Sequence, residues 1–436
     1  MALSTKPYKG ARDFYPEDKR LQTYLFSTIR KTVAKFGYEE YDAPILEPLE
    51  LYLAKTGDEI VNEQTYVFTD RGDREVVIRP EMTPTVSRMV AARRQELPFP
   101  VRWFSIPNLW RYERPQRGRL REHWQLNVDL FGVAGLEAEH ELIVVVDEIF
   151  KAFKAKHDMY EIKLNNRKLV DHFLLDYLGL DSVQAHSVGK LIDRKNKMSE
   201  AMFEAQADAI LTPSQREAGV LNKLLGVMKI KKLSHLPEDL REHDSAKDLQ
   251  KMLDLLAASG ITNAHYDPTL MRGFDYYTGI VFEVFDTNPE NNRAMLGGGR
   301  YDGLVGLFGV EPVPTVGFGW GDVTLQNFLE THELLPPKKT PVDVYVVMLD
   351  LNLYEKAQKT IASLRSMGMN VAVDMTGRKA DKQIKSADKQ AIAFALFIGA
   401  KELEEGVFNL KNLHTGHEEA HSIERIVTMI KDHRRK

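Results

Sequence analysis

Five arginines gather around one short turn, and they are the strongest chemical feature of this sequence. In chain order they are Arg111, Arg114, Arg117, Arg119 and Arg121. The turn itself runs from Pro115 to Gly118, and Glu113 is the single carboxylate among the arginines. A guanidinium group binds phosphate or carboxylate through two parallel hydrogen bonds. The spacing therefore predicts a hairpin whose turn binds an anion.

The residues after this turn alternate strictly between apolar and polar. One side would carry Trp124, Leu126, Val128 and Leu130, and the other Arg121, His123, Gln125, Asn127 and Asp129. A period of two predicts a half-buried strand, on which residues of one face lie about 6 to 7 Å apart. An anion-binding end at Arg121 could therefore continue into a small-molecule site at Gln125 and Asp129. The alternative is a solvated sheet face beside a basic turn.

Composition limits the classes of protein to consider. The 436 residues suggest two to four domains, and 59 basic against 63 acidic side chains leave a formal net charge of -4. This balance neither requires nor excludes nucleic-acid binding. With no cysteine, disulfides and thiolate chemistry are excluded, and zinc would need His and carboxylate ligands alone. No signal peptide or membrane span is expected, so we predict a cytoplasmic protein.

Several common catalytic motifs are absent. The sequence contains no Walker A pattern, no glycine fingerprint after a first strand, no H-E-x-x-H pair and no Ser-centred nucleophile elbow. We identify no metal ligands from the sequence. A nucleotide would therefore have to bind on an arginine-bearing antiparallel sheet.

The elements before the arginine turn place a carboxylate near it. A helix is expected from Pro16 to the glycine at residue 37. Residues 41–50, with two prolines, read as an edge strand, an exposed arm or a plain loop. A short strand over 76–79 should turn into a helix with Thr83 as its N-cap. Glu81 would then lie at a strand-to-helix junction, pointing into a cleft or only complementing the helix dipole.

The glycine-rich segments follow a long helical region. A helix is expected over 137–153, a helical insertion or separate module over 166–262, and a strand over 280–285. The runs at 296–303 and 316–321 would bring backbone close to a ligand or make a tight bend. A helix over 323–329 follows them.

Beyond a proline-marked linker, alternating strands and helices predict a small α/β domain. Arg378, Lys382, Lys385 and Lys389 would share one face of its second helix, as a nucleic-acid surface or a merely charged solvent face. The domains expected are 1–165 and 263–333 as two parts of a catalytic domain, 166–262 as the insertion, 334–341 as the linker and 342–436 as the last domain.

These motifs together resemble the class II aminoacyl-tRNA synthetases, and among them the histidyl-tRNA synthetase family. The segment around Pro44 looks like motif 1 of the class, residues 111–129 like motif 2 and the glycines of 316–321 like motif 3. Residues 272–279 (Arg-Gly-Phe-Asp-Tyr-Tyr-Thr-Gly) and 298–302 (Gly-Gly-Arg-Tyr-Asp) are similar to two signatures of the histidine enzymes. The resemblance implies an α+β catalytic domain with an antiparallel sheet, a helical insertion and an α/β domain like the anticodon-binding domain.

The resemblance also implies a role for each site residue. The α-ammonium of histidine would be held by Glu81, Thr83 and Gln125, and its imidazole by Asp129, Tyr276 and Tyr277. Arg111 and Arg272 would be the catalytic residues, flanking the histidine carboxylate and the α-phosphate of ATP. Arg119 and Arg121 would meet the triphosphate, and Gln116 the acceptor end of tRNA.

Three positions depart from the family pattern. Asp129 stands where some members carry Glu, and His123 stands where an adenine-stacking Phe or Tyr is frequent. Thr324 occupies the position of the arginine that ends motif 3 and packs against ATP.

The implied activity is ATP-dependent activation of histidine and its transfer to tRNA(His), with Mg²⁺ accompanying ATP and a homodimer as the assembly. Two alternatives are a non-catalytic, histidine-binding paralogue, like the regulatory subunit of ATP phosphoribosyltransferase, and a nucleic-acid-binding module without catalysis.

Overall fold

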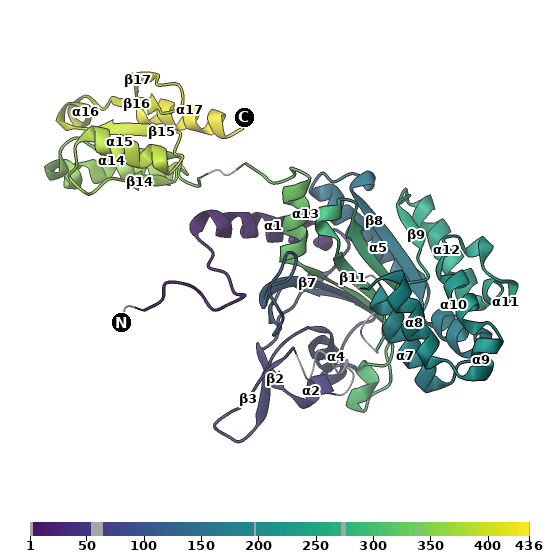
Figure 1. Cartoon of the computed structure of the whole chain (residues 1–436). Helices are drawn as coiled ribbons and strands as arrows, with labels where there is room; N and C mark the ends of the chain where they lie inside the picture. The colour runs from purple at the N-terminus through teal and green to yellow at the C-terminus, as the bar shows by residue number, and fades with distance from the viewer. Residues whose placement is uncertain (1–2, 54–63, 196–197, 272–275, 338–339, 436) are drawn as a thin grey trace. The chain divides into compact units, whose positions relative to one another are not determined.

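A largely antiparallel sheet is the frame of the first part of the chain (Figure 1). The computed structural model describes residues 3–53, 64–195, 198–271, 276–337 and 340–435. Within these ranges the sheet has nine strands in the order β1-β5-β7-β12-β11-β10-β8-β9, with β6 paired to β7. Within this sheet, the described strands form parallel pairs only at β1–β5 and β8–β9. The strands are β1 (Glu39–Glu40), β5 (Val101–Ser105), β6 (Asn108–Trp110), β7 (Glu122–Phe131), β8 (Tyr160–Asn166), β9 (Ala264–Tyr266), β10 (Ile280–Asp286), β11 (Ala294–Arg300) and β12 (Thr315–Gly321).

Strand β7 has the amphipathic character that its sequence predicts. Leu126, Val128 and Leu130 are at most 2% exposed and lie in the main hydrophobic core. The alternative of a solvated polar face is wrong, because Asn127 and Asp129 on the opposite face are also buried. The polar side of this strand therefore faces an enclosed site.

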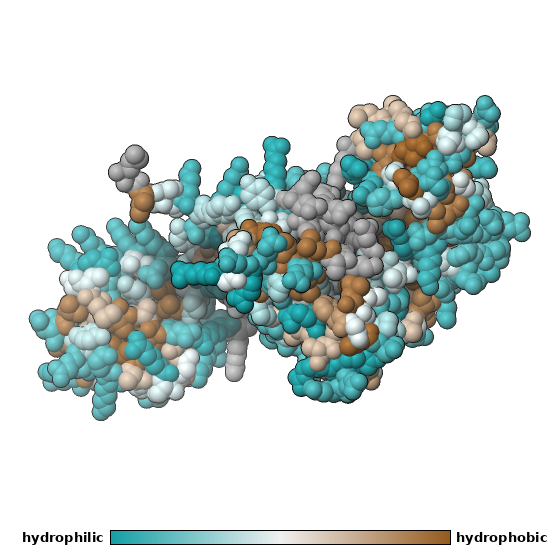
Figure 2. Space-filling view, turned by 90° about the horizontal axis from the view of Figure 1, so that it is seen from below, coloured by the Kyte–Doolittle hydropathy of each residue, from teal (hydrophilic) through white to brown (hydrophobic). Residues whose placement is uncertain are grey.

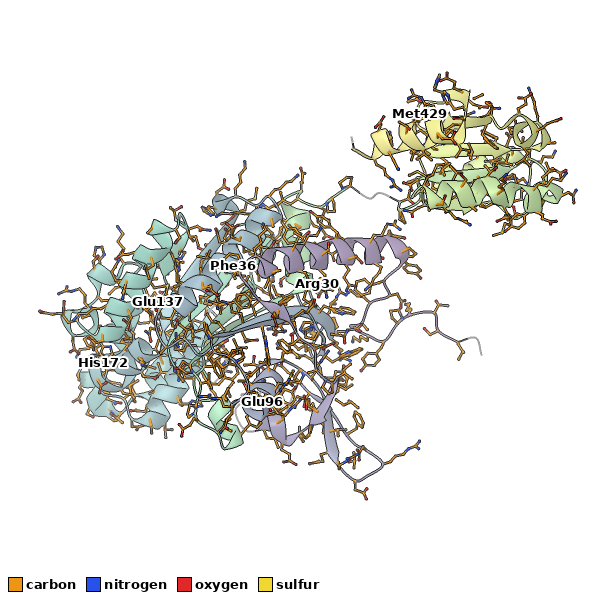
Figure 3. The ribbon with its side chains drawn as sticks, turned by 180° about the vertical axis from the view of Figure 1, so that it is seen from behind. Arg30, Phe36, Glu96, Glu137, His172 and Met429 are labelled. Carbon is orange, nitrogen blue, oxygen red and sulfur yellow. The ribbon has the colours of Figure 1, made fainter. Side chains whose placement is uncertain are left out.

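Three helices accompany the sheet: α1 (Pro16–Ala34), α5 (Glu137–Ala152) and α13 (Asp322–Thr331). Helices α1 and α5 contact each other, and α5 packs on β12. Figure 3 shows α1, with Arg30 labelled, from behind. Leu25 and Ile29 of α1 belong to the same buried core as Val146 and Phe150 of α5. Gly37 has a φ of 80°, which suits the predicted glycine stop after α1.

A smaller sheet and two helices lead to the arginine turn. Its strands β2 (Leu46–Pro48), β4 (Glu75–Ile78) and β3 (Tyr66–Thr69) pair in that order, next to α2 (Glu50–Leu53) and α4 (Thr83–Ala92). The prediction of Thr83 as the N-cap of α4 is wrong. Met82 holds the cap position without a side-chain cap bond, and Thr83 is the first helical residue.

The region between β8 and β9 is helical, as predicted. Its helices are α6 (Arg167–His172), α7 (Ser182–Asp193), α8 (Glu200–Ile210), α9 (Pro213–Glu217), α10 (Val220–Met228), α11 (Glu238–Arg241) and α12 (Asp244–Ala258). Their buried side chains, such as Leu191, Phe203 and Leu249, join the same core cluster as those of the sheet. The described structure separates only residues 1–335 from 336–436, so the finer domain limits stay a prediction.

The second unit has its own five-stranded sheet in the order β14-β13-β15-β16-β17. Its elements are β13 (Val344–Met348), α14 (Tyr354–Ser366), β14 (Val371–Val373), α15 (Ala380–Lys389), β15 (Phe394–Ile398), α16 (Ala400–Glu405), β16 (Phe408–Asn412), β17 (Glu418–His421) and α17 (Ile423–Arg435). Arg378 was predicted on the second helix, but it precedes α15 and forms an ion pair with Asp374 at 2.8 Å. Among the described residues no helix is long and apolar enough to cross a membrane.

Candidate active site

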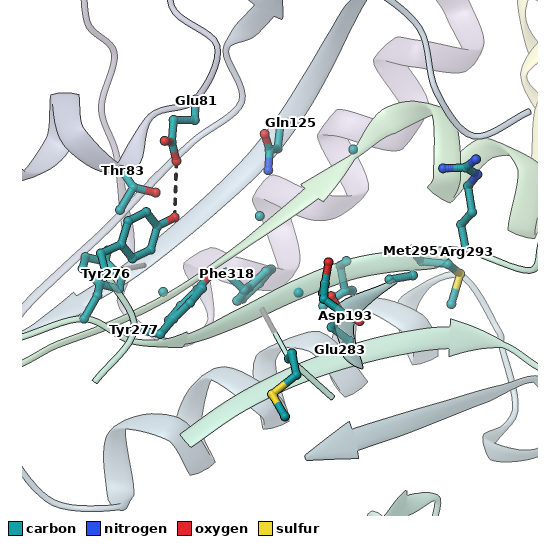
Figure 4. Close-up of a pocket in the computed structure, with 18 of the residues that line it drawn as sticks. Glu81, Thr83, Gln125, Asp193, Tyr276, Tyr277, Glu283, Arg293, Met295 and Phe318 are labelled. Atoms are coloured by element: carbon teal, nitrogen blue, oxygen red, sulfur yellow. Dashed lines mark hydrogen bonds between the residues drawn. The ribbon is translucent and has the colours of Figure 1, made fainter. Parts of the chain in front are cut away.

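A cavity of about 1250 Å³ opens over the polar face of β7 and its neighbours β10, β11 and β12. It collects most of the predicted site residues, which are Glu81, Thr83, Arg111, Arg119, His123, Gln125, Asp129, Tyr276 and Tyr277. In Figure 4, Glu81, Tyr276 and Tyr277 gather at one end of the cavity, and Arg293 lies at the other. We call the end with Glu81 and the tyrosines the acidic end and the end with Arg293 the cationic end, and Asp193 and Glu283 lie between them, nearer to Arg293.

Asp129 is a deeply buried carboxylate of the site, only 3% exposed. One of its oxygens, Oδ1, accepts a hydrogen bond from the Tyr301 hydroxyl, and the other, Oδ2, is buried without a partner in the described structure. Burial raises the pKa of Asp129 to about 7, although the bond from Tyr301 acts in the opposite direction. A buried acceptor without a partner is unfavourable. A ligand N–H group in the cavity would satisfy it.

The raised pKa predicts that Asp129 makes folding stability fall with rising pH. An unfolded Asp ionises near its ordinary pKa of about 3.9, whereas the folded protein keeps this proton up to about pH 7. Between these values the folded state binds more protons, so its free energy of unfolding decreases as pH rises. Between about pH 4 and pH 7 this effect lowers the free energy of unfolding by on the order of 4 kcal/mol. Asp129→Asn should remove it.

Urea unfolding followed by tryptophan fluorescence at pH 4 to 7.5 measures this effect. The chain has four tryptophans, Trp103, Trp110, Trp124 and Trp320, all within residues 1–335. The signal therefore reports on the unit that contains Asp129. If the free energies of unfolding of wild type and Asp129→Asn differ by the same amount at every pH in this range, the prediction is wrong.

Further acceptors surround the same end of the cavity. Glu81 is 3% exposed, and its Oε2 accepts a hydrogen bond of 3.3 Å from the Tyr276 hydroxyl. The rings of Tyr276 and Tyr277 lie 4.8 Å apart, so they form one aromatic wall. The side-chain oxygen of Gln125 is buried and has no partner in the described residues. This set of acceptors and rings fits a small ligand with several N–H donors and a flat ring.

The glycines of β12 make room for the two polar side chains of β7. Gly317 pairs with Asp129 in the register of the sheet. A Cβ atom at Gly317 would overlap the Asp129 carboxylate, and one at Gly319 would overlap the Gln125 amide. In β11, a Cβ at Gly299 would come within 2.8 Å of the Tyr277 ring. The alternative of a tight bend is wrong, because the glycines lie inside paired strands. They admit side chains of neighbouring strands, and a close approach to a ligand stays a prediction.

Gly319→Ala should raise the KM for the small ligand of this end about tenfold, because the new methyl group displaces the Gln125 amide and its hydrogen bonds. Steady-state kinetics measure the effect, and a thermal melt checks that the fold persists. Gly303→Ala is the matched control, since nothing lies within 4 Å of its Cβ position. Equal KM values for the two variants would contradict the prediction.

The other end of the cavity is cationic. The Nε of Arg111 donates to the Pro80 carbonyl at 2.9 Å, and Arg119 forms an ion pair with Glu113 at 2.9 Å. Burial and the charges of Arg111 and nearby arginines lower the pKa of His123 to about 3. At neutral pH this imidazole is uncharged. It can present its flat ring to a base without adding charge.

Some predicted residues lie elsewhere. Arg121 was predicted to meet the triphosphate but does not line the cavity. Its guanidinium lies 3.9 Å from the Tyr112 ring centroid and donates to the Tyr8 hydroxyl at 3.0 Å. Gln116 is exposed in the turn. Arg272 falls outside the described residues, so its predicted role stays a prediction.

The sequence patterns did not single out Arg293, which lines the cavity next to Thr324. It belongs to the connection between β10 and β11, where no periodicity or motif marks a functional arginine. Helix α7 also contributes to the lining, through His186 and Lys190 among others. These contributions depend on tertiary contacts between distant segments.

Two family models match this chain. The family model described as "Histidyl-tRNA synthetase" matches residues 10–321, and one described as "Anticodon binding domain" matches residues 343–433. A protein of Leptospira biflexa named histidine–tRNA ligase is 44% identical over 99% of this chain and 98% of its own. One of Opitutus terrae with the same name is 39% identical over 97% of each chain.

Solved structures show the same architecture. The crystal structure of histidyl-tRNA synthetase from Nostoc sp. PCC 7120 superimposes with a TM-score of 0.82, at 26% sequence identity. The match covers 99% of this chain and 100% of the other. The predicted fold class is confirmed, and the chain belongs to the histidyl-tRNA synthetase family.

Proposed function

We propose that this chain is a histidine–tRNA ligase, which activates L-histidine with ATP and transfers it to tRNA(His). The observation that carries the proposal is one continuous cavity with buried hydrogen-bond acceptors at one end and arginines at the other. This distribution of charge suits an amino acid whose ammonium group faces the acceptors and whose carboxylate meets the phosphates of ATP.

The acidic end would bind histidine. The three ammonium protons of histidine would meet Glu81, Thr83 and Gln125, and its imidazole would donate to Oδ2 of Asp129 next to the wall formed by Tyr276 and Tyr277. Asp129 and the tyrosines would hydrogen-bond and contact the imidazole ring. An amino acid with an apolar side chain would leave these buried polar groups without partners. No editing domain is then needed.

The cationic end would bind ATP. Arg111 would flank the histidine carboxylate and the α-phosphate, and the family resemblance gives Arg272 the same role. Arg119 would meet the phosphates, and the uncharged ring of His123 would stack on the adenine. Arg121 is better placed to hold the arginine turn through Tyr8 and Tyr112.

The chemistry has two steps. The histidine carboxylate attacks the α-phosphorus and pyrophosphate leaves. A terminal ribose hydroxyl of tRNA then attacks the carbonyl of the adenylate and AMP leaves. The first nucleophile is already ionised, so that step requires no general base, and positioning together with charge stabilisation by the arginines would lower the barrier.

Mg²⁺ would enter with ATP and neutralise part of the phosphate charge. Among the residues that the structure describes, no three His, Asp or Glu side chains are grouped to hold a metal ion. Phosphate oxygens and water would therefore provide most ligands of the ion, which fits a metal that arrives bound to its nucleotide.

Exposed residues outside the cavity would contact tRNA and a second copy of the chain. Lys382 and Lys385 are exposed on α15 and would contact tRNA, together with Arg378 before the helix and Gln116 near the active site. The three-stranded sheet exposes Leu46, Val67 and Phe68, which supports a homodimer through the motif 1 region. Figure 2 shows apolar patches among the hydrophilic side chains of the surface.

Histidine-dependent exchange of labelled pyrophosphate into ATP tests the proposal, followed by charging of tRNA(His). Exchange without charging would indicate activation alone. Histidine binding without exchange would favour the regulatory paralogue, and binding of nucleic acid alone would favour the third alternative. The family match over both units disfavours the paralogue.

A further inference from the structure

Arg293 is a further cation in the lining of the cavity. It is half-buried in the connection between β10 and β11, and its side chain lines the cavity at the end opposite Glu81 (Figure 4). Within the described ranges of the chain, Arg293 makes no hydrogen bond or ion pair. A half-buried guanidinium without a partner loses hydration and gains little in return. This arrangement suits a ligand anion.

Arg119 adds a second positive charge beside it. Burial and the charge of Arg119 lower the pKa of Arg293, and Glu113 only partly offsets them. Glu113 is itself in an ion pair with Arg119 at 2.9 Å. The Glu113 carboxylate is therefore already paired with Arg119 and does not neutralise Arg293. An anion with more than one charge would relieve their mutual repulsion.

Hydrogen bonds around the buried carboxylate of Asp286 hold the connection that carries Arg293. Asp286 accepts hydrogen bonds from the Asn291 side chain at 2.7 Å and from the Asn288 backbone at 2.8 Å, and His332 lies 2.8 Å from the same carboxylate. Arg117 of the arginine turn donates to Asn291 at 2.9 Å. The turn and the connection are thus joined, and Arg293 and Arg119 approach the cavity from fixed backbone positions.

Thr324 of α13 lies against the same spot but contributes no charge. Measured from the Cβ position of Gly118, Cγ2 of Thr324 is 3.5 Å away and Cδ of Arg293 is 3.9 Å away. The Thr324 hydroxyl donates to the Met295 carbonyl at 2.7 Å, so it is bound to the chain beside Arg293. A side chain from either position would reach the same region of the cavity.

We propose that Arg293, together with Arg119, binds the β- and γ-phosphates of ATP, the part that leaves as pyrophosphate. Arg293 takes the place of a cation that Thr324 does not supply. The assignment rests on the proposed function, because the phosphates become pyrophosphate only if the carboxylate attacks at the α-phosphorus. Arg293 thereby helps to position the leaving group in line with the nucleophile.

Arg293→Met tests this assignment in the full-length protein, with Arg71→Met as the control. Arg71 is an exposed arginine of the β3–β4 turn, away from the cavity lining. In the exchange assay the KM values for ATP and pyrophosphate should rise about tenfold or more, since a charge-assisted bond is lost. The KM for histidine should stay within about twofold.

A binding titration separates phosphate contacts from a general disturbance of the site. Arg293→Met should weaken ATP binding about tenfold but leave AMP binding unchanged, because AMP lacks the β- and γ-phosphates. An equal loss for ATP and AMP, unchanged constants for ATP and pyrophosphate, or a loss seen only in tRNA charging would each overturn the assignment. The titration needs no catalysis, so absence of exchange in the wild type would reject only the proposed function.

A double variant that moves the positive charge from Arg293 to the position of Thr324 gives a second, independent measurement. Thr324→Arg in the Arg293→Met background should recover at least part of the lost ATP affinity, because both positions reach the same place. Failure of the double variant to recover would overturn the claim that the two positions serve one anion.

Discussion

Arg111→Ala is expected to lower the rate of histidine-dependent pyrophosphate exchange by about a hundredfold or more. Arg111 lines the cavity, and its Nε donates to the Pro80 carbonyl at 2.9 Å. In the proposed role, its remaining N–H groups would donate to the charge that grows on the phosphoryl oxygens. Removing one such donor typically costs about 3 to 4 kcal/mol of barrier.

The neighbouring Arg114→Ala is a matched control for this prediction. Arg114 belongs to the same arginine turn, but it is exposed and is absent from the cavity lining. Its substitution should change exchange less than about threefold, as expected for a solvated surface charge. A loss below fivefold for Arg111→Ala, or equal losses for both variants, would remove Arg111 from the reacting centre.

Asp129→Ala should raise the KM for histidine about a hundredfold and change the KM for ATP by less than about threefold. The buried Oδ2 of Asp129 is the acceptor assigned to the imidazole, and its loss leaves a ligand N–H unpaired in an apolar environment. Tyr301, whose hydroxyl donates to Oδ1, would also lose its partner. Steady-state kinetics with each substrate varied in turn measure the two constants.

Asp129→Asn separates charge from shape in the same experiment. The amide oxygen can still accept from Tyr301, while the position facing the ligand loses its full acceptor character. Its KM for histidine should therefore lie between those of wild type and Asp129→Ala. Equal effects of Asp129→Ala on histidine and ATP would place Asp129 outside the amino-acid pocket.

Local patterns predicted the elements on which the site is built. The strict alternation after the arginine turn predicted β7 because a period of two depends only on the strand geometry. The helix after Pro16 and its glycine stop follow in the same way from local capping rules. Errors occurred where a boundary was decided by a single residue, as for Thr83 in α4 and Arg378 before α15.

The role of the glycines could be stated only as alternatives from the sequence. The sequence left open whether these glycines bring backbone close to a ligand or make a tight bend, and what Gly317 does depends on which strand lies beside it. The register that places Gly317 opposite Asp129 joins two strands far apart in the sequence. The hydrogen bond from Tyr301 to Asp129 likewise spans 172 positions. No local pattern contains such information.

The sequence by itself determined the residue types of the site, the strand that carries them and the family to which they belong. Tertiary structure alone decided which arginines face the cavity, since Arg121 turns to Tyr8 and Tyr112 while Arg293 enters from another strand connection. The reason is physical: periodicity follows from the geometry of one element, whereas a guanidinium takes its partner from whatever packing brings within hydrogen-bond distance.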